Sequence, residues 1–247
     1  MIRLSLAQAA SLAGWFTPER PGPLVGAHVL RTGLGSFWVD CLPAPRAMLV
    51  EAAGNYSLAG AASALGPGDL PPLEGFIEAP PAFVPVLRAA VPALAPWERV
   101  IFELPGAPAA APADAPLRRL GPADAPALDG LSDECHWVSN TWGGPAGLAA
   151  SGHAWGAFAA GRLVSVAGTF FLGEVYEDVA VATEPGWRGR GLSPACAAAL
   201  CADICARGRR PCWSTSADNP ASQRVAQKLG FVLHRHDLLY RTDRSLV

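Results

Sequence analysis

Two glycines and two arginines lie close together in the segment Arg188-Gly-Arg-Gly-Leu-Ser193, between a predicted strand and a predicted helix. Glycines let the backbone turn without side chains that block a ligand, and the start of a helix presents unpaired N–H groups at its positive end. We expect Ser193 to be the N-cap and Pro194 the first helical residue. A phosphate or pyrophosphate suits such a turn, and Arg188 and Arg190 add positive charge to it.

The loop differs from two other phosphate-binding motifs. A P-loop requires Gly-Lys-Ser/Thr after a longer loop, and the segment has none. A dinucleotide-binding fingerprint requires a third glycine where this chain has Pro194. On these residues alone, a connector between strand and helix with no ligand stays an alternative.

Two motifs in order carry a family resemblance. Arg188 to Ser193 resembles the R-x-x-G-x-G/A acyl-CoA pyrophosphate motif of the GNAT superfamily of N-acetyltransferases, with Ser193 in place of the final Gly or Ala. Downstream, Asn219-Pro-Ala-Ser222 and Gln227-Lys-Leu-Gly-Phe231 resemble the second cofactor segment of that family. The resemblance covers the C-terminal half of the chain.

The resemblance implies acetyl-CoA as co-substrate, no metal, and direct attack by a primary amine of a small molecule or peptide in a ternary complex. The implied contacts with acetyl-CoA come from the end of one strand, the loop and the next helix: Val181, Ala182, Thr183, Arg188, Gly189, Arg190, Gly191, Leu192, Ser193, Asn219 and Ser222. Asn219 is also expected to cap the helix whose first residue is Pro220.

An attacking amine must lose a proton, because a free alkylamine has a pKa near 10.4. The resemblance places a carboxylate early on the strand before the loop, which is the position of Glu177. In a regular strand Asp178 faces the other way, and a bulge would exchange the two; water is a third alternative. The family's usual acid, a Tyr, is replaced by Ala226. Ser222 is expected to hydrogen-bond the cofactor sulfur or the pantetheine arm, but it is a poor acid, which leaves water to protonate the thiolate.

Two other functions stay open. Because the usual Tyr is absent, one alternative is a non-catalytic module that binds or senses acyl-CoA. The other is an enzyme that transfers an acyl group longer than acetyl, since the sequence does not determine the length of the acyl chain. A loop of aromatic and polar residues, His136–Trp142, is the candidate wall of the acceptor site.

These residues must be positioned by alternating strands and helices. The patterns predict an α/β (α+β) fold. The resemblance implies that its C-terminal part is a GNAT-type mixed, mostly antiparallel sheet flanked by helices. Strands are expected at Phe37–Asp40, Ala47–Glu51, Tyr56–Ala59, Arg99–Leu104, Ala154–Ala159, Arg162–Phe171, Tyr176–Thr183, Pro211–Thr215 and Val232–Arg241. Helices are expected at Leu6–Trp15, Pro81–Val91, Ala123–Leu131, Pro194–Ala206 and Pro220–Leu229.

The segment 105–116 is rich in Pro and Ala and has no bulky apolar side chain, so it predicts a linker. It would separate an N-terminal α/β domain (1–104) of unknown role from the acyl-CoA-binding catalytic domain (117–247). Residues 39–50 and 78–81 are similar to uncharacterised two-part bacterial members of the superfamily. The N-terminal domain is therefore expected to be a degenerate GNAT-like half or a lid over the acceptor site.

Composition excludes several classes. The 247 residues include 19 Lys+Arg and 21 Asp+Glu, so the chain lacks the basic excess that is typical of nucleic-acid-binding proteins. Only one of the 19 basic residues, Lys228, is a lysine. Six cysteines without metal spacing predict reduced, mostly buried thiols in a cytoplasmic protein. No apolar run is typical of a membrane span. A homo-oligomer stays open.

Overall fold

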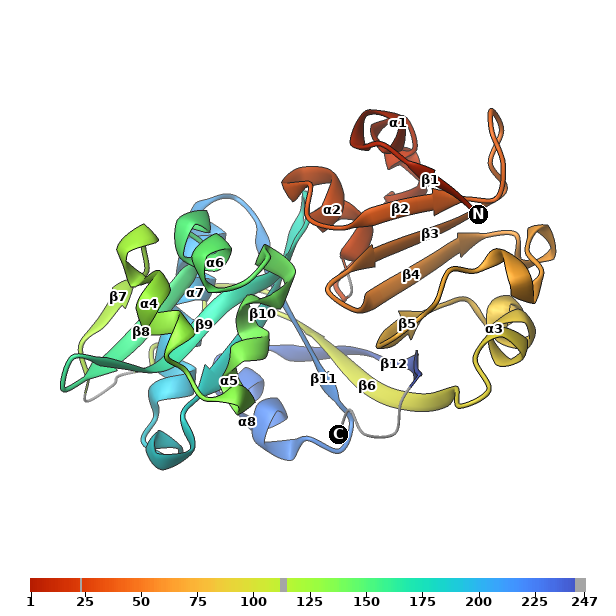
Figure 1. Cartoon of the computed structure of the whole chain (residues 1–247). Helices are drawn as coiled ribbons and strands as arrows, with labels where there is room; N and C mark the ends of the chain where they lie inside the picture. The colour runs from red at the N-terminus through yellow and green to blue at the C-terminus, as the bar shows by residue number, and fades with distance from the viewer. Residues whose placement is uncertain (23, 112–114, 243–247) are drawn as a thin grey trace. The chain divides into compact units, whose positions relative to one another are not determined.

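The structure is a computed structural model that describes residues 1–22, 24–111 and 115–242. The chain forms two compact units (Figure 1). Unit 1 comprises Met1–Pro18, Val25–Arg99 and the C-terminal segment from His236. Unit 2 comprises Glu19–Leu24 and Val100–Arg235. Two strands, β6 (Ala95–Glu103) and β12 (Val232–Arg241), therefore contribute residues to both units.

Unit 1 is built on antiparallel strands followed by one parallel pair, with the order β1-β2-β3-β4-β5. Its strands are β1 (Ile2–Leu4), β2 (Ser36–Val39), β3 (Ala47–Ala52), β4 (Asn55–Gly60) and β5 (Phe76–Glu78). Its helices are α1 (Leu6–Ala10), α2 (Val25–Thr32) and α3 (Val84–Ala90), with 3-10 turns η1 (Ala13–Phe16), η2 (Ala62–Ala64), η3 (Pro67–Asp69) and η4 (Pro81–Phe83). The last residues of β12, Tyr240 and Arg241, pair antiparallel with β5.

Unit 2 has the strand order β6-β11-β10-β9-β8-β7, in which β10 and β11 are parallel and the pairs from β10 to β7 are antiparallel. Its other strands are β7 (Leu117–Arg119), β8 (Ala154–Ala159), β9 (Arg162–Leu172), β10 (Tyr176–Thr183) and β11 (Arg210–Ser216). Its helices are α4 (Ala125–Asp129), α5 (Asp133–His136), α6 (Pro145–Ser151), α7 (Leu192–Ala206) and α8 (Pro220–Lys228), with 3-10 turns η5 (Pro122–Asp124), η6 (Trp137–Trp142) and η7 (Pro185–Trp187).

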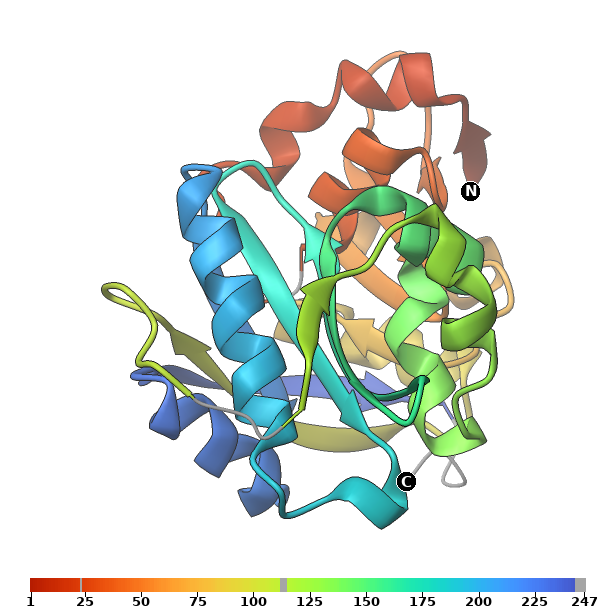
Figure 2. The same ribbon diagram turned by 90° about the vertical axis from the view of Figure 1, so that its left-hand side faces the viewer.

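Helices cover both faces of the unit 2 sheet. On one face α7 lies along β8, β9 and β10, as Figure 2 shows, and shares a core with α8 and the buried Trp213. On the other face α4, α5, η6 and α6 pack around Leu128, Val138 and Leu148. Successive residues of β10 alternate between these cores, because Val179 belongs to the first and Ala180 to the second. The predicted mixed, mostly antiparallel sheet with flanking helices is confirmed.

Most predicted elements of the C-terminal half are present within two residues of their expected bounds, and Ala154–Ala159, Tyr176–Thr183 and Val232–Arg241 coincide with β8, β10 and β12. The helix expected at Leu6–Trp15 is interrupted: it forms α1 and then the 3-10 turn η1. The helix after the glycine loop begins at Leu192, two residues before the expected Pro194.

The described residues of the segment predicted as a linker, 105–111 and 115–116, belong to unit 2. Ala111 and Ala115 pack against its core, and the Ala109 N–H donates to the Leu229 carbonyl at 3.0 Å. Residues 112–114 of this segment lie outside the described residues. The chain passes from unit 1 to unit 2 at Arg99/Val100, before this segment. The division into 1–104, 105–116 and 117–247 stays a prediction about functional domains.

The six cysteines are free thiols, four of them buried, as expected. Across residues 1–22, 24–111 and 115–242, His, Cys, Asp and Glu side chains form no cluster that could hold a metal ion. Within the same ranges, no helix has both the length and the apolar character that crossing a membrane requires.

Candidate functional site

The site begins where two parallel strands separate. β10 and β11 pair only through Tyr176–Asp178 and Arg210–Cys212. Beyond Asp178, β10 stays bonded to β9 on one side, through Val179 to Thr183, but no longer to β11 on the other. Backbone N–H and C=O groups along this free edge are available to a ligand that adds to the strand.

The glycine loop closes the wide end of this gap. Gly189 and Gly191 have φ of 78° and 76°, left-handed values that favour glycine. Gly191 is the N-cap of the 15-residue helix α7, which places the first-turn N–H groups of α7 at the loop. Ser193 therefore is not the N-cap as expected; its hydroxyl lies 2.7 Å from Thr183 Oγ1 and ties the loop to the end of β10.

A cavity of about 590 Å³ lies in unit 2 between β10, β11, the loop and α8, a volume that suits a cofactor-sized ligand. Its lining combines small side chains with three cations and one carboxylate. The charged lining residues are Glu134, Arg188, Arg224 and Lys228, and the aromatic ones are Trp137, Trp187 and Trp213.

All the residues predicted to contact acetyl-CoA line this cavity except Arg190. The members are Val181, Ala182, Thr183, Arg188, Gly189, Gly191, Leu192, Ser193, Asn219 and Ser222. The Arg190 guanidinium instead lies over the Trp187 ring at 4.5 Å and donates to the Gly186 carbonyl at 3.3 Å. The structure brings the two predicted motifs together around one space, and their contact with a ligand stays a prediction.

The start of α8 forms one wall of the cavity. Asn219 caps it as predicted, because its side chain accepts a hydrogen bond from the Ser222 N–H at 3.0 Å. The Ser222 hydroxyl oxygen accepts from Trp213 Nε1 at 3.0 Å, so the hydroxyl proton can point to a ligand. Ala226, at the position where the resemblance expects a Tyr, is fully buried in the core.

Glu177 lies outside the cavity lining, in a buried cluster of ionic groups. Its carboxylate accepts hydrogen bonds from Thr169, Arg207 and Arg209, and His153 Nδ1 lies 3.3 Å away. Burial raises the pKa of Glu177, but His153, Arg207 and Thr169 outweigh it and lower the pKa to about 2. A carboxylate with this pKa and no access to the cavity is poorly suited to the predicted base role.

Asp178 points away from this ionic cluster. The β9–β10 register shifts at this position, because Asp178 pairs with Phe171 and Val179 pairs with Thr169. The Asp178 carboxylate is nearly buried and accepts a hydrogen bond from Ser214 Oγ at 3.1 Å. Ser214 lines the cavity, so its hydroxyl connects the narrow end of the cavity to the Asp178 carboxylate.

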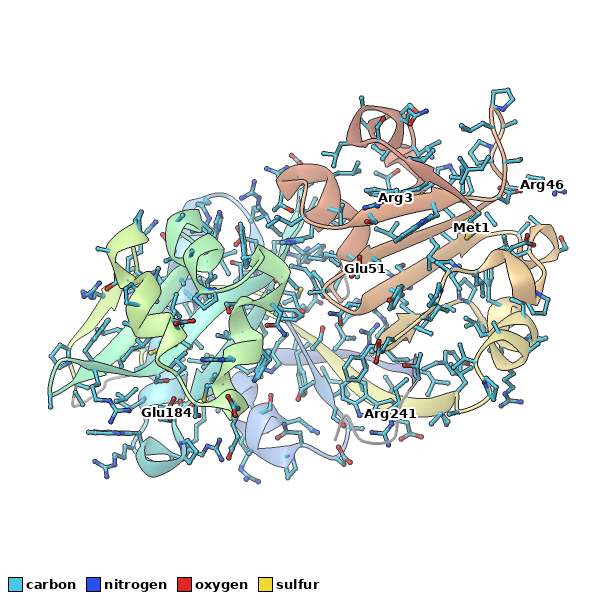
Figure 3. All side chains as sticks on the ribbon, viewed as in Figure 1. Met1, Arg3, Arg46, Glu51, Glu184 and Arg241 are labelled. Carbon is cyan, nitrogen blue, oxygen red and sulfur yellow. The ribbon has the colours of Figure 1, made fainter. Side chains whose placement is uncertain are left out.

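The short helix α5 contributes cavity residues that sequence reasoning missed. Glu134 Oε2 accepts from Arg188 Nη2 at 2.6 Å across the cavity mouth. Glu184, labelled in Figure 3 at the end of β10, accepts from the Ser132 N–H at 2.7 Å and anchors the same segment. Of the expected acceptor wall His136–Trp142, Trp137 lines the cavity. No local signal distinguishes Glu134 from other exposed carboxylates, because its partner is 54 residues away.

The residues present fit an acyl-CoA. A Cβ built at Gly189 would meet no atom within 4 Å, so the loop leaves open space in front of its N–H groups. An elongated thioester with phosphates at one end matches a strand edge at the narrow end and a cationic helix start at the wide end. Fold and site together define the class of acyl-CoA-dependent transferases.

Comparison with known proteins gives the same class. A sequence model of the family described as GNAT acetyltransferase matches residues 109–240. An N-acetyltransferase described as uncharacterized, from the mutA 5′ region of Streptomyces virginiae, is 46% identical over 198 residues, which cover 78% of this chain and 84% of that protein. The chain belongs to the GNAT acetyltransferase family and is an acyltransferase.

Solved structures share the fold over nearly the whole chain. A GCN5-related N-acetyltransferase-like protein from Streptococcus suis has a TM-score of 0.74 at 17% identity, covering 97% of this chain and 100% of its own. A tandem GNAT protein from the clavulanic acid biosynthesis pathway has a TM-score of 0.57 at 14% identity, covering 97% and 96%. Both units therefore have counterparts within GNAT-type structures.

Proposed function

We propose that this protein is a cytoplasmic N-acetyltransferase that moves an acetyl group from acetyl-CoA to a primary amine of a small molecule or peptide. The proposal depends above all on one observation: the free edge of β10 and the N-terminus of α7 line the same cavity. In this reading residues 117–247 carry catalysis and 1–104 have a separate role. The amine attacks directly, in a ternary complex.

The loop binds the donor's pyrophosphate in this proposal. N–H groups at the first turn of α7 donate to its oxygens, and Arg188 adds a charge-assisted hydrogen bond. Arg188 is already oriented by the Thr183 carbonyl, which accepts from its Nε at 3.1 Å. Edge N–H groups of β10 stabilise the negative charge that develops on the thioester oxygen.

For the proton acceptor we propose the Ser214–Asp178 pair in place of Glu177. Ser214 faces the cavity and its hydroxyl already donates to Asp178. An amine proton that moves to Ser214 Oγ is balanced by transfer of the Ser214 proton to Asp178. Ser222 donates a hydrogen bond to the thioester sulfur, and because no Tyr occupies position 226, water protonates the departing thiolate.

Two measurements on the purified full chain test the proposed function: calorimetric binding of acetyl-CoA, and release of free thiol across a panel of primary amines. We expect micromolar binding and turnover with at least one amine. Binding without turnover on any amine would favour a non-catalytic sensor. Turnover only with longer acyl-CoAs would assign a different acyl group, and absence of all binding would refute the proposal.

A further inference from the structure

The α8 helix presents two cations to the cavity that the pyrophosphate loop does not require. Arg224 and Lys228 both line it, one helical turn apart, together with Ala221, Ser222 and Val225 on the same stripe. Both side chains belong to exposed residues, and neither has an ionic or hydrogen-bonding partner in the part of the chain that the structure describes. Lys228 is the only lysine of the chain.

Charge around the cavity contrasts with that of the whole protein. The chain has a formal net charge of −2, whereas the cavity lining has three cations and the single carboxylate Glu134. Glu134 is paired with Arg188, which leaves the charges of Arg224 and Lys228 uncompensated. A favourable helix dipole accounts for a cation in the last turn of α8, at Lys228, but not for Arg224 in the middle.

The order of side chains along α8 gives the ligand a direction. Small residues, Ala221 and Ser222, come first, next to Trp213 and the point where the strands separate. Lys228 follows Ser222 by six residues, a rise of about 9 Å along the helix. The cations therefore lie away from the reacting end of a donor, and on a different helix from the loop that takes the pyrophosphate.

Resting on the proposed function, we propose that Arg224 and Lys228 bind a second phosphate group of the donor, the 3′-phosphate of its nucleotide. This phosphate is a dianionic monoester separated from the pyrophosphate, so it requires cations of its own. The pair would make the enzyme discriminate coenzyme A from dephospho-coenzyme A, which differ only in this group.

The experiment measures dissociation constants of both ligands by calorimetry for the full chain. The wild type is expected to bind coenzyme A about tenfold more tightly than dephospho-coenzyme A. Arg224→Gln and Lys228→Gln should each lower this ratio about threefold, and the double variant should bring it close to one. Binding of dephospho-coenzyme A should change less than about twofold. The charge-matched control is Arg162→Gln, an exposed residue at the start of β9 outside the cavity, which should keep the wild-type ratio.

Two results would overturn the inference alone. In one, the double variant keeps the wild-type ratio; in the other, both ligands weaken equally, which would mean that the cations act on the pyrophosphate. A wild type that binds neither ligand would overturn the proposed function together with the inference, so the two failures are distinguishable.

Discussion

Units 1 and 2 have the same order of antiparallel and parallel strands, but they differ in the segment that connects the two parallel strands. In unit 1, β2, β3 and β4 are antiparallel and β5 then pairs parallel with β4; in unit 2, β8, β9 and β10 are antiparallel and β11 pairs parallel with β10. A helix follows the second strand of each pair, α3 in unit 1 and α8 in unit 2.

The connections between the paired strands are different. In unit 2, β10 leads through Gly189 and Gly191 into the 15-residue helix α7. In unit 1, β4 ends at Gly60 and leads into the 3-10 turns η2 and η3, of three residues each, in a segment rich in proline. Turns of this length do not build the aligned dipoles that make a helix start attractive to an anion.

The ends of the two parallel pairs also differ in chemistry. The last pair in unit 1 joins Ser57 to Glu78, whose carboxylate lies 3.7 Å from the buried Arg99 guanidinium. In unit 2 the last pair joins Asp178 to Cys212, and the cavity lies beyond it. The two units therefore share the strand order, and we expect the capacity to bind an acyl donor to depend on one loop and on the groups where the strands of unit 2 separate.

Gly191→Trp should have the largest effect on this comparison. The indole would occupy the space in front of the loop N–H groups, so we expect the dissociation constant of acetyl-CoA to rise at least about 100-fold, measured by calorimetry, with the circular dichroism spectrum unchanged. Gly208→Trp is the control, because Gly208 has the same φ of 76° at the other end of α7 and open space around it. Equal loss of binding in both variants would show general destabilisation.

The same substitution in unit 1 tests whether function is confined to one connection. Gly68 lies in η3, with no atom within 4 Å of an added Cβ. Gly68→Trp should leave acetyl-CoA binding within about twofold of the wild type, since no anion site is expected there. Weakened donor binding in this variant would contradict the asymmetry between the units.

Of the two adjacent carboxylates of β10, we expect Asp178 to act in catalysis and Glu177 to act in stability. Asp178→Asn should lower kcat about 100-fold with the dissociation constant of acetyl-CoA unchanged, because the proposed proton acceptor is lost. Provided that it folds, the Glu177→Gln variant should have a kcat within a few-fold of the wild-type value. Steady-state kinetics with the best amine of the panel measures both. The opposite result, with turnover lost only in Glu177→Gln, would return the base role to Glu177.

Glu177 should instead determine stability and its pH dependence. Its pKa is lowered from 4.5 to about 2 in the folded state, so its ionised form stabilises the protein above pH 4.5 by about 3 kcal/mol, a contribution lost as the pH falls from 4.5 towards 2. Urea unfolding of Glu177→Gln should show a comparable loss at pH 7 and a flatter acid profile. The exposed Glu98→Gln is the control. Identical acid profiles for wild type and Glu177→Gln would contradict this role.

A modest gain in donor affinity is expected from a change at the cavity mouth. Glu134→Gln removes the carboxylate that competes with a phosphate for Arg188, so acetyl-CoA should bind about threefold more tightly, and less so at high salt. Asp133→Asn removes the same charge one residue earlier, from an exposed residue outside the cavity lining. Calorimetry at two salt concentrations would contradict the competition if both variants bound donor equally.

By itself the sequence determined the features whose causes are local. Glycines at a strand end and Asn219 before Pro220 act within a few residues, so the position of the loop, the cap of α8 and the strands β8 to β12 could be predicted closely. Only tertiary structure decided that Asp178, and not Glu177, bonds to a residue of the cavity lining, Ser214. Arg207 and Arg209 bind Glu177 although they lie about 30 residues away in the sequence. The pairing register of β9 and β10 also shifts between Asp178 and Val179.

The same reason explains the charged residues of the cavity. No short-range pattern separates Lys228, near the end of a helix, or Glu134, next to Asp133, from other surface charges. Their positions around one cavity follow from the packing of α8 and α5 beside β10, which short-range patterns do not encode. Local chemistry thus determined the position of the proposed phosphate-binding loop, whereas long-range packing decided which charged side chains line the cavity beside it.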